Sequence, residues 1–171
     1  MKYLLTATLA AATIVCPGVA ISQNASKGAA KFVGADGKEI GSADLTGTKA
    51  GVMIAVEIAG LPPGQWVAFH VHQTGTCDHT NGHESAGGHF NPTNAEHGYL
   101  TAEGQHAGDM PNQYVSADGT LRAQVFNTAV TLEDGDSAIK GRALMIHADP
   151  DDYSGQPSGN AGKRLACAVI E

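Results

Sequence analysis

The sequence predicts an all-β domain of short antiparallel strands, interrupted by two long loops. Apolar segments of strand length recur at fairly regular spacing and are separated by turn residues such as Gly, Pro, Asp and Asn, a pattern typical of antiparallel sheets. In residues 51–60, Val52, Ile54, Val56 and Ile58 occupy alternate positions, as in a strand with one buried face. No segment predicts a helix longer than a turn or two.

Turn signals divide the expected strands from one another. Asp36-Gly37 and Asp118-Gly119 suit tight turns, because Gly and Asp tolerate the positive φ angles that such turns need. Leu61-Pro62-Pro63-Gly64 cannot continue a hydrogen-bonded ladder, because proline has no amide hydrogen to donate. The expected strands are Ala29–Ala35, Lys38–Leu45, 51–60, Trp66–His72, Gln113–Ser116, Leu121–Phe126, Lys140–His147 and Arg164–Ile170.

Two segments do not fit the strand pattern. Residues 73 to about 111 are rich in Gly, His, Asn, Asp and Thr, and residues 148–163 are rich in Asp, Gly, Ser and Pro. Irregular loops of this length are uncommon in a compact domain and are usually functional or disordered. The histidines in the first segment favour a functional loop.

The first 20 residues have the order of a secretory signal peptide. Lys2 precedes an apolar run that is too short to span a bilayer, and small residues follow Pro17. We expect cleavage near Ala20, with Ser22 as the alternative, and a flexible leader over residues 21–28. Cys16 raises the alternative of a lipoprotein, which the bulky residue before it disfavours. The sequence therefore predicts a periplasmic or otherwise secreted protein without a membrane span.

The remaining residues fit one domain. Removal of Lys2 leaves 9 basic and 17 acidic side chains, a formal charge of −8, which argues against nucleic acid as a partner. Cys77 and Cys167 are the cysteines that remain after cleavage. In an oxidising compartment they are most simply a disulfide, and two unpaired buried thiols are the alternative.

All eight histidines lie between His70 and His147. On the strand Trp66–His72, His70 and His72 point to one face about 6.6 Å apart, while the apolar residues between them point to the other. Two adjacent imidazoles on a packed strand form half of a metal site. His147 ends a later strand with similar alternation and can offer a third imidazole.

The long loop adds nitrogen and carboxylate donors. His89, His97, His106 and Asp109 follow one another at spacings of eight, nine and three residues, and a set of four such donors suits tetrahedral zinc. Imidazole also suits copper, so the residue types leave the two metals unresolved. A single loop histidine is usually a surface residue, but clustering of the whole set favours ligands.

The ordered motifs of this chain resemble the copper,zinc superoxide dismutase family and cover almost all of residues 29–171. They are His70-Val71-His72, Gly87-Gly88-His89-Phe90-Asn91-Pro92, His97-Gly98, His106-x-Gly108-Asp109, Gly141-Arg142 through His147, and Gly159 through Cys167. The resemblance implies a flattened eight-stranded antiparallel Greek-key β-barrel with two long functional loops. It also implies dismutation of superoxide to dioxygen and hydrogen peroxide.

The resemblance further implies one copper and one zinc ion per chain. Copper would be bound by His70, His72, His89 and His147, and zinc by His89, His97, His106 and Asp109. His89 would bridge the two ions and carry a proton during turnover. Asp151 would orient one histidine of each set, Arg164 would bind the superoxide anion beside copper, and Cys77 and Cys167 would form the family disulfide.

Some features depart from the family pattern. His79 and His83, in the stretch between Cys77 and His89, have no family role, and we expect both to be exposed and to help capture scarce metal. Residues 152–158 are few and lack the Glu and Lys residues that guide superoxide in the animal enzymes. Met110-Pro111 resembles bacterial members, whose assembly differs from that of eukaryotic ones. The oligomeric state stays open, a homodimer included.

Two other functions compete with the enzymatic one. A periplasmic copper or zinc carrier on the same barrel is the main alternative, but a carrier could dispense with Arg164 and Asp151. A structural Greek-key domain that has lost its ligands is the second, and the presence of all seven expected ligands disfavours it.

Overall fold

The computed structural model describes residues 25–171, which form eight antiparallel strands and two 3₁₀ turns. The expected signal peptide, residues 1–20, lies outside the described residues. The strands are β1 (Lys27–Gly34), β2 (Glu39–Thr48), β3 (Gly51–Ile58), β4 (Trp66–His72), β5 (Asp109–Tyr114), β6 (Leu121–Asn127), β7 (Ala143–His147) and β8 (Arg164–Val169), and the 3₁₀ turns are η1 (His79–Asn81) and η2 (Glu84–Ala86).

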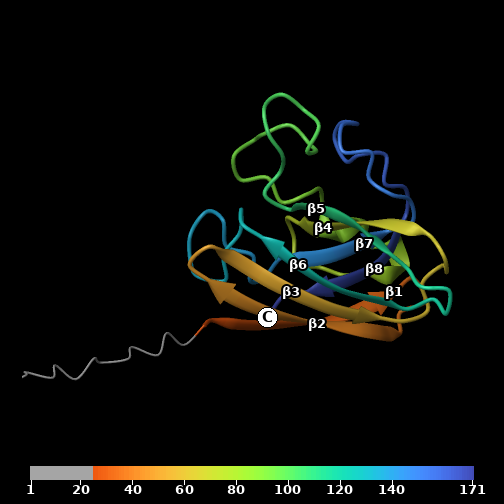
Figure 1. The fold of residues 1–171 in the computed structure, drawn as a ribbon. Coiled ribbons are helices and arrows are strands. Elements are labelled where there is room, and N and C mark those ends of the chain that lie inside the picture. The colour runs from red at the N-terminus through yellow and green to blue at the C-terminus, as the bar shows by residue number, and fades with distance from the viewer. Residues whose placement is uncertain (1–24) are drawn as a thin grey trace, which may run out of the picture.

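The strands form one sheet in the order β5-β4-β7-β8-β1-β2-β3-β6, and its two end strands, β5 and β6, approach each other. The sheet therefore curls into a nearly closed barrel (Figure 1). The chain crosses from β3 to β4 and from β6 to β7 between strands that are not neighbours, as in a Greek key. The expected all-β Greek-key barrel is confirmed.

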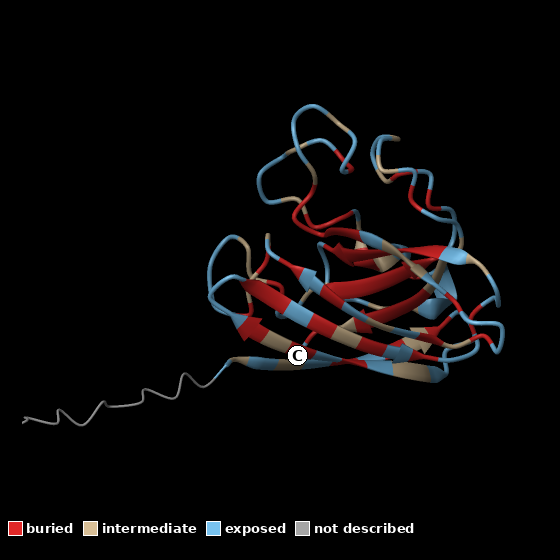
Figure 2. Cartoon of the chain, viewed as in Figure 1, coloured by how far each residue is buried: buried red, intermediate tan, exposed pale blue. Residues whose placement is uncertain are grey.

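Alternating apolar residues fill the barrel. Val52, Ile54, Val56 and Ile58 of β3 are all buried, as their spacing predicts, and Figure 2 shows buried segments alternating with more exposed ones along this strand. On β4, by contrast, every residue after Trp66 is buried, so both faces of this strand are covered. The outer face of β4 is buried because the long loops cover the side of the barrel on which its histidines lie.

Several strand ends differ from the expected positions. β5 begins at Asp109 rather than Gln113, because Asp109 and Met110 pair with β4. It tolerates Pro111 because it ends the sheet and therefore needs partners on one side only. β7 begins at Ala143 rather than Lys140. β1 begins at Lys27, within the segment expected to be a leader.

The two expected loops lie over the same side of the barrel, next to β5 and β4, as the green and blue segments at the top of Figure 1 show. A disulfide between Cys77 and Cys167 joins the start of the first loop to β8, with a Cα–Cα distance of 5.5 Å. Met145 and Ala86 are buried around it. In the described part of the chain, no helix has the length and apolar character to cross a membrane.

Replacement of both disulfide cysteines by alanine should lower the free energy of unfolding by about 4 to 5 kcal/mol. The bond closes a loop with a sequence separation of 90, and opening a loop of this length increases the entropy of the unfolded chain. Denaturant unfolding of the metal-free forms measures the loss. A loss below about 1 kcal/mol would contradict the expected constraint.

Candidate metal centre

Four buried histidines converge where strands β4 and β7 meet the first loop. His70 and His72 come from β4, and His147 ends β7. His89 lies in the loop, where its backbone pairs with that of His72 in an isolated antiparallel β-bridge. One ring nitrogen from each lies within 4.8 Å of the other three. The Nε2 atoms of His72 and His147 are 3.2 Å apart. This set of four is called the imidazole group below.

The imidazole group fits a cation. His70 Nδ1 and His89 Nε2 are buried, and neither has a hydrogen-bond partner among the described residues. An unpartnered buried nitrogen is costly, and a bound ion would remove that cost. His72 donates from Nδ1 to the carbonyl oxygen of Gly87 at 2.9 Å, which leaves its Nε2 lone pair available for a metal.

A second group combines three histidines with a carboxylate. It consists of His89, His97, His106 and Asp109, and their ligand atoms also lie within 4.8 Å of one another. His89 Nδ1 and His97 Nδ1 are 3.0 and 3.1 Å from Asp109 Oδ1. This set is called the mixed group below, and its nitrogen and oxygen donors suit tetrahedral zinc.

The backbone orients Asp109 toward the mixed group. The amides of Gly98 and His106 donate to Asp109 Oδ2 at 2.9 and 3.0 Å. These bonds hold one carboxylate oxygen and leave Oδ1 facing the histidines. The loop therefore folds around the carboxylate that belongs to the group.

His89 belongs to both groups through opposite ring nitrogens. Its Nδ1 faces the mixed group, 3.0 Å from Asp109 and 3.5 Å from His106 Nδ1, and its Nε2 is the unpartnered atom on the side of the imidazole group. The rings of His70 and His89 lie 3.9 Å apart between centroids. A single imidazole thus separates the two candidate ion positions.

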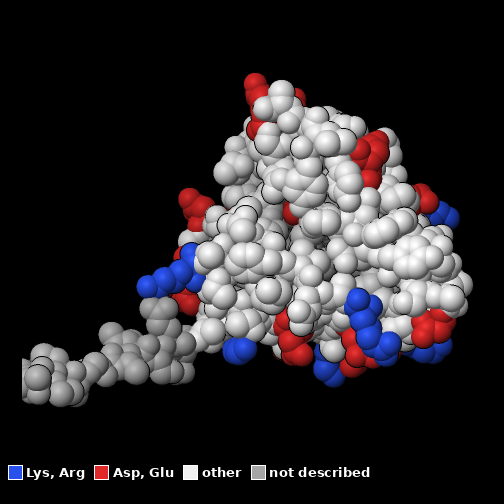
Figure 3. All heavy atoms as spheres, viewed as in Figure 1, with Lys and Arg blue, Asp and Glu red and all other residues white. Residues whose placement is uncertain are grey.

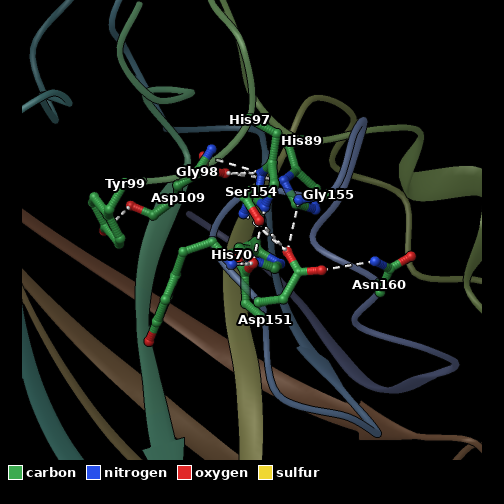
Figure 4. Close-up of polar contacts among 12 residues, drawn as sticks. His70, His89, His97, Gly98, Tyr99, Asp109, Asp151, Ser154, Gly155 and Asn160 are labelled. Carbon is green, nitrogen blue, oxygen red and sulfur yellow. Dashed lines mark hydrogen bonds and ion pairs between the residues drawn. The ribbon is translucent and has the colours of Figure 1, made fainter. Parts of the chain in front are cut away.

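Asp151 connects one histidine of each group through the ring nitrogens that face away from the groups. Its Oδ2 accepts from His70 Nε2 at 2.8 Å, and its Oδ1 accepts from His97 Nε2 at 3.0 Å (Figure 4). These bonds fix both rings so that each Nδ1 points into its own group. His70, His97 and Asp151 could themselves form a third ion site, but the Asp151 contacts use the ring nitrogens opposite to the two groups.

Burial keeps three rings of the imidazole group, those of His72, His89 and His147, neutral. Burial and the neighbouring imidazoles lower the pKa of His72 to about 2 and that of His147 to about 3. Burial also lowers the pKa of His89 to about 4, although its hydrogen bond to Asp109 opposes the shift. Neutral imidazole is the form that binds metals. At pH 7 these rings are already neutral, so a metal ion does not have to displace a proton from the imidazolium form.

In and beside the mixed group, the pKa values of His97, Asp109 and Asp151 are shifted toward the charged forms. Burial disfavours the charged form of His97, but hydrogen bonds to Asp109 and Asp151 outweigh it and raise the pKa of His97 to about 9. Burial likewise opposes ionisation of the two carboxyls, yet the histidine hydrogen bonds hold the pKa of Asp109 and that of Asp151 well below the usual range. Two ionised carboxylates therefore favour a divalent cation here.

Arg164 lines the pocket above the imidazole group. This pocket has a volume of about 560 Å³ and is also lined by His72, His89 and His147. Arg164 donates from Nη1 to the carbonyl oxygen of His83 at 2.7 Å and from Nη2 to that of Gly87 at 2.8 Å. The guanidinium is thus fixed at the mouth of the centre.

The expectation for His83 was wrong. Its side chain is fully buried, and neither ring nitrogen has a hydrogen-bond partner in the described part of the chain, while His79 is exposed as expected. The polar sequence around His83 suggested a surface position, but its backbone adopts φ 62° and the ring turns inward. Metal capture by two exposed imidazoles therefore has no structural basis.

The comparisons with known proteins agree with this geometry. Residues 39–170 match the family model described as copper/zinc superoxide dismutase. The chain belongs to the copper/zinc superoxide dismutase family. It is 49% identical to superoxide dismutase [Cu-Zn] 2 of Aquifex aeolicus (strain VF5), over 84% of this chain and 86% of that one.

Solved structures of the family have the same fold. A superoxide dismutase-like protein from Bacillus subtilis superposes with a TM-score of 0.78 and 36% identity, covering 82% of this chain and 95% of that one. The Cu/Zn superoxide dismutase of Brucella abortus gives 0.70 and 30% identity, covering 85% and 100%. All seven side chains that the resemblance assigned to metals lie in the two groups.

Sequence reasoning missed one residue that holds the mixed group. Gln156 accepts from the His97 amide at 2.9 Å through Oε1 and donates to the His97 carbonyl at 3.0 Å through Nε2. The side-chain amide thus pairs with the backbone of His97 much as a neighbouring strand would. A single Gln in a polar loop gives no signal of this role in the sequence.

Replacement of Asp151 by asparagine should weaken metal binding by about 10- to 100-fold. The amide nitrogen cannot accept a hydrogen bond, so the ring of either His70 or His97 loses its anchor. Competition with a chelator measures the affinities for zinc and copper. Asp134→Asn, an equal charge change at an exposed site, is the control, and equal affinities in all three proteins would contradict the orienting role.

Proposed function

We propose that the chain catalyses the dismutation of superoxide, in which two superoxide ions and two protons give one dioxygen and one hydrogen peroxide. The observation that carries this proposal is His89, which offers opposite nitrogens to two four-residue groups. Family membership supports it as well. Since one similar structure is described only as superoxide dismutase-like, the ligand set of this chain is the stronger support.

The two groups differ in the metals that they suit. In this proposal His70, His72, His89 and His147 hold copper, while His89, His97, His106 and Asp109 hold zinc, one ion of each per chain. Four imidazole donors suit copper, and nitrogen donors with a carboxylate suit zinc. When bound, copper would supply the one-electron oxidation and reduction of superoxide, and zinc would supply a fixed positive charge without redox chemistry.

The side chains in and around the pocket transfer protons, hold the rings in place and bind the anion. His89 can hold a proton at Nε2 and pass it to the reduced oxygen species, since it lines the pocket. Asp109 and Asp151 keep the surrounding rings in place while that proton moves. Arg164 attracts and orients the anion through the N–H groups that its carbonyl partners leave free.

The alternative function, a periplasmic copper or zinc carrier, is not favoured. A carrier must release its ion, whereas Asp151 fixes one ring of each group. A carrier also has no need for an arginine at the mouth of the pocket.

We further propose that the protein acts in the periplasm or is otherwise secreted, after cleavage near Ala20. The apolar N-terminal run supports an exported chain, and the Cys77–Cys167 disulfide is of the kind that persists in oxidising compartments. The negative net charge disfavours nucleic acid as a partner.

A xanthine oxidase–cytochrome c assay of the mature protein, loaded with copper and zinc, tests the activity. We expect inhibition of cytochrome c reduction in proportion to the copper content, with about one copper and one zinc ion per chain by elemental analysis. His147→Ala removes one ligand of the imidazole group and serves as the control. A fully loaded wild-type protein without activity would contradict the proposal.

Replacement of Arg164 tests the steering role. At low salt, Arg164→Glu should lower the bimolecular rate more than Arg164→Lys, since lysine keeps the charge but loses the planar fork. Loss of steering costs about 10-fold or more, a magnitude known from electrostatically steered enzymes that include superoxide dismutases. Pulse radiolysis of copper-verified proteins measures the rates, and equal rates for all three would assign Arg164 a structural role instead.

A further inference from the structure

The guanidinium that faces the pocket also contacts an acid. Glu84 Oε2 lies 3.2 Å from Arg164 Nη2, and Glu84 lines the same pocket as His72, His89 and His147. The resemblance gave Glu84 no role, because it lies in the stretch between Cys77 and His89 that departs from the family pattern. An anion entering the pocket therefore meets a cation whose charge is partly offset by this carboxylate.

The turn that carries Glu84 is fixed on both sides. His83 precedes it with a fully buried ring, and Ala86, at the end of η2, is buried beside the disulfide. The amide of His83 donates to the carbonyl oxygen of Asp78 at 2.8 Å, and that of Ala86 donates to the carbonyl oxygen of His83 at 3.1 Å. The buried His83 ring thus anchors the turn from which Glu84 reaches Arg164.

The ion pair contributes little to folding stability. The Glu84 side chain is 70% exposed and that of Arg164 is 14% exposed, and ion pairs that are open to solvent add little to stability. Two backbone carbonyls already hold the guanidinium in place. The main consequence of Glu84 is therefore its charge at the mouth of the pocket.

Few cations in the surrounding loops offset that charge. Residues 73–111 contain no Lys or Arg, and residues 148–163 contain Lys163 alone. On the face in Figure 3, the upper part, formed by the two loops, shows acidic but no basic side chains. Arg164 is thus the main side-chain cation at the pocket, in an acidic setting, and a carboxylate in contact with it offsets part of that charge.

We propose that Glu84 lowers the anion affinity of the pocket by offsetting part of the charge of Arg164, so that small anions are held more weakly than they would be beside an unpaired Arg164. This inference deepens the proposed function and rests on it for the identity of the substrate. The same offset acts on superoxide and on competing anions of equal charge.

Azide, a small monovalent anion, is a suitable probe for the copper- and zinc-loaded protein. An anion beside Arg164 would lie several ångströms from the Glu84 carboxylate, where a unit charge in a water-like medium changes affinity by about two- to fourfold. In Glu84→Gln, azide should bind more tightly and superoxide should react faster, each by this factor at low ionic strength. Both gains should shrink at high salt because the charge is screened.

Two further variants make the test specific. Glu103→Gln removes one negative charge from an exposed position in the same loop and should leave azide affinity near that of the wild type. Glu84→Asp keeps the charge and should do the same. Unchanged azide affinity in Glu84→Gln, or an equal gain in Glu103→Gln, would overturn the inference.

The two proposals can fail separately. A loaded wild-type protein that does not consume superoxide contradicts the proposed function, while the azide titrations still test Glu84 by optical spectroscopy. Conversely, an active wild type whose azide affinity does not respond to Glu84→Gln overturns the role of Glu84 alone.

Discussion

The imidazole of His89 is the element on which the rest of the centre depends. Six histidines and two carboxylates are buried in one small region, where unpartnered nitrogens are costly. Because His89 presents one nitrogen to each group, neither group is complete without it. Two cations, held on either side of this ring, would remove the cost and couple the two sites.

The barrel and the loops contribute different kinds of order to this centre. The ladder between β4 and β7 fixes His70 and His72, and pairing with Arg164 of β8 fixes His147, so the imidazole group has a rigid base. The mixed group lies on the long loop, where Asp109 and Gln156 replace sheet geometry with side-chain hydrogen bonds to the backbone. The disulfide then links β8 to the loop segment that contains His83, whose carbonyl oxygen accepts a hydrogen bond from Arg164.

The sequence predicted the barrel and the two groups because both rest on short patterns. Alternation located β3 and β4, the clustering of His and Asp marked candidate ligands, and the family resemblance divided them between the two groups. The pairing of Asp109 with His70 is set by contact between distant segments, so the start of β5 was not predictable locally. The burial of His83 and the contact of Glu84 with Arg164 depend on how the loop closes onto β8, which no local pattern encodes.

The most direct test of the shared ring uses cobalt as a spectroscopic substitute for zinc. In protein loaded with copper and cobalt, a bridging His89 should couple the two ions magnetically, and the copper resonance should be lost at low temperature. Copper-only protein should keep the ordinary copper spectrum and serves as the reference. If the fully loaded wild type shows two independent ions, His89 does not bridge and the central claim is contradicted.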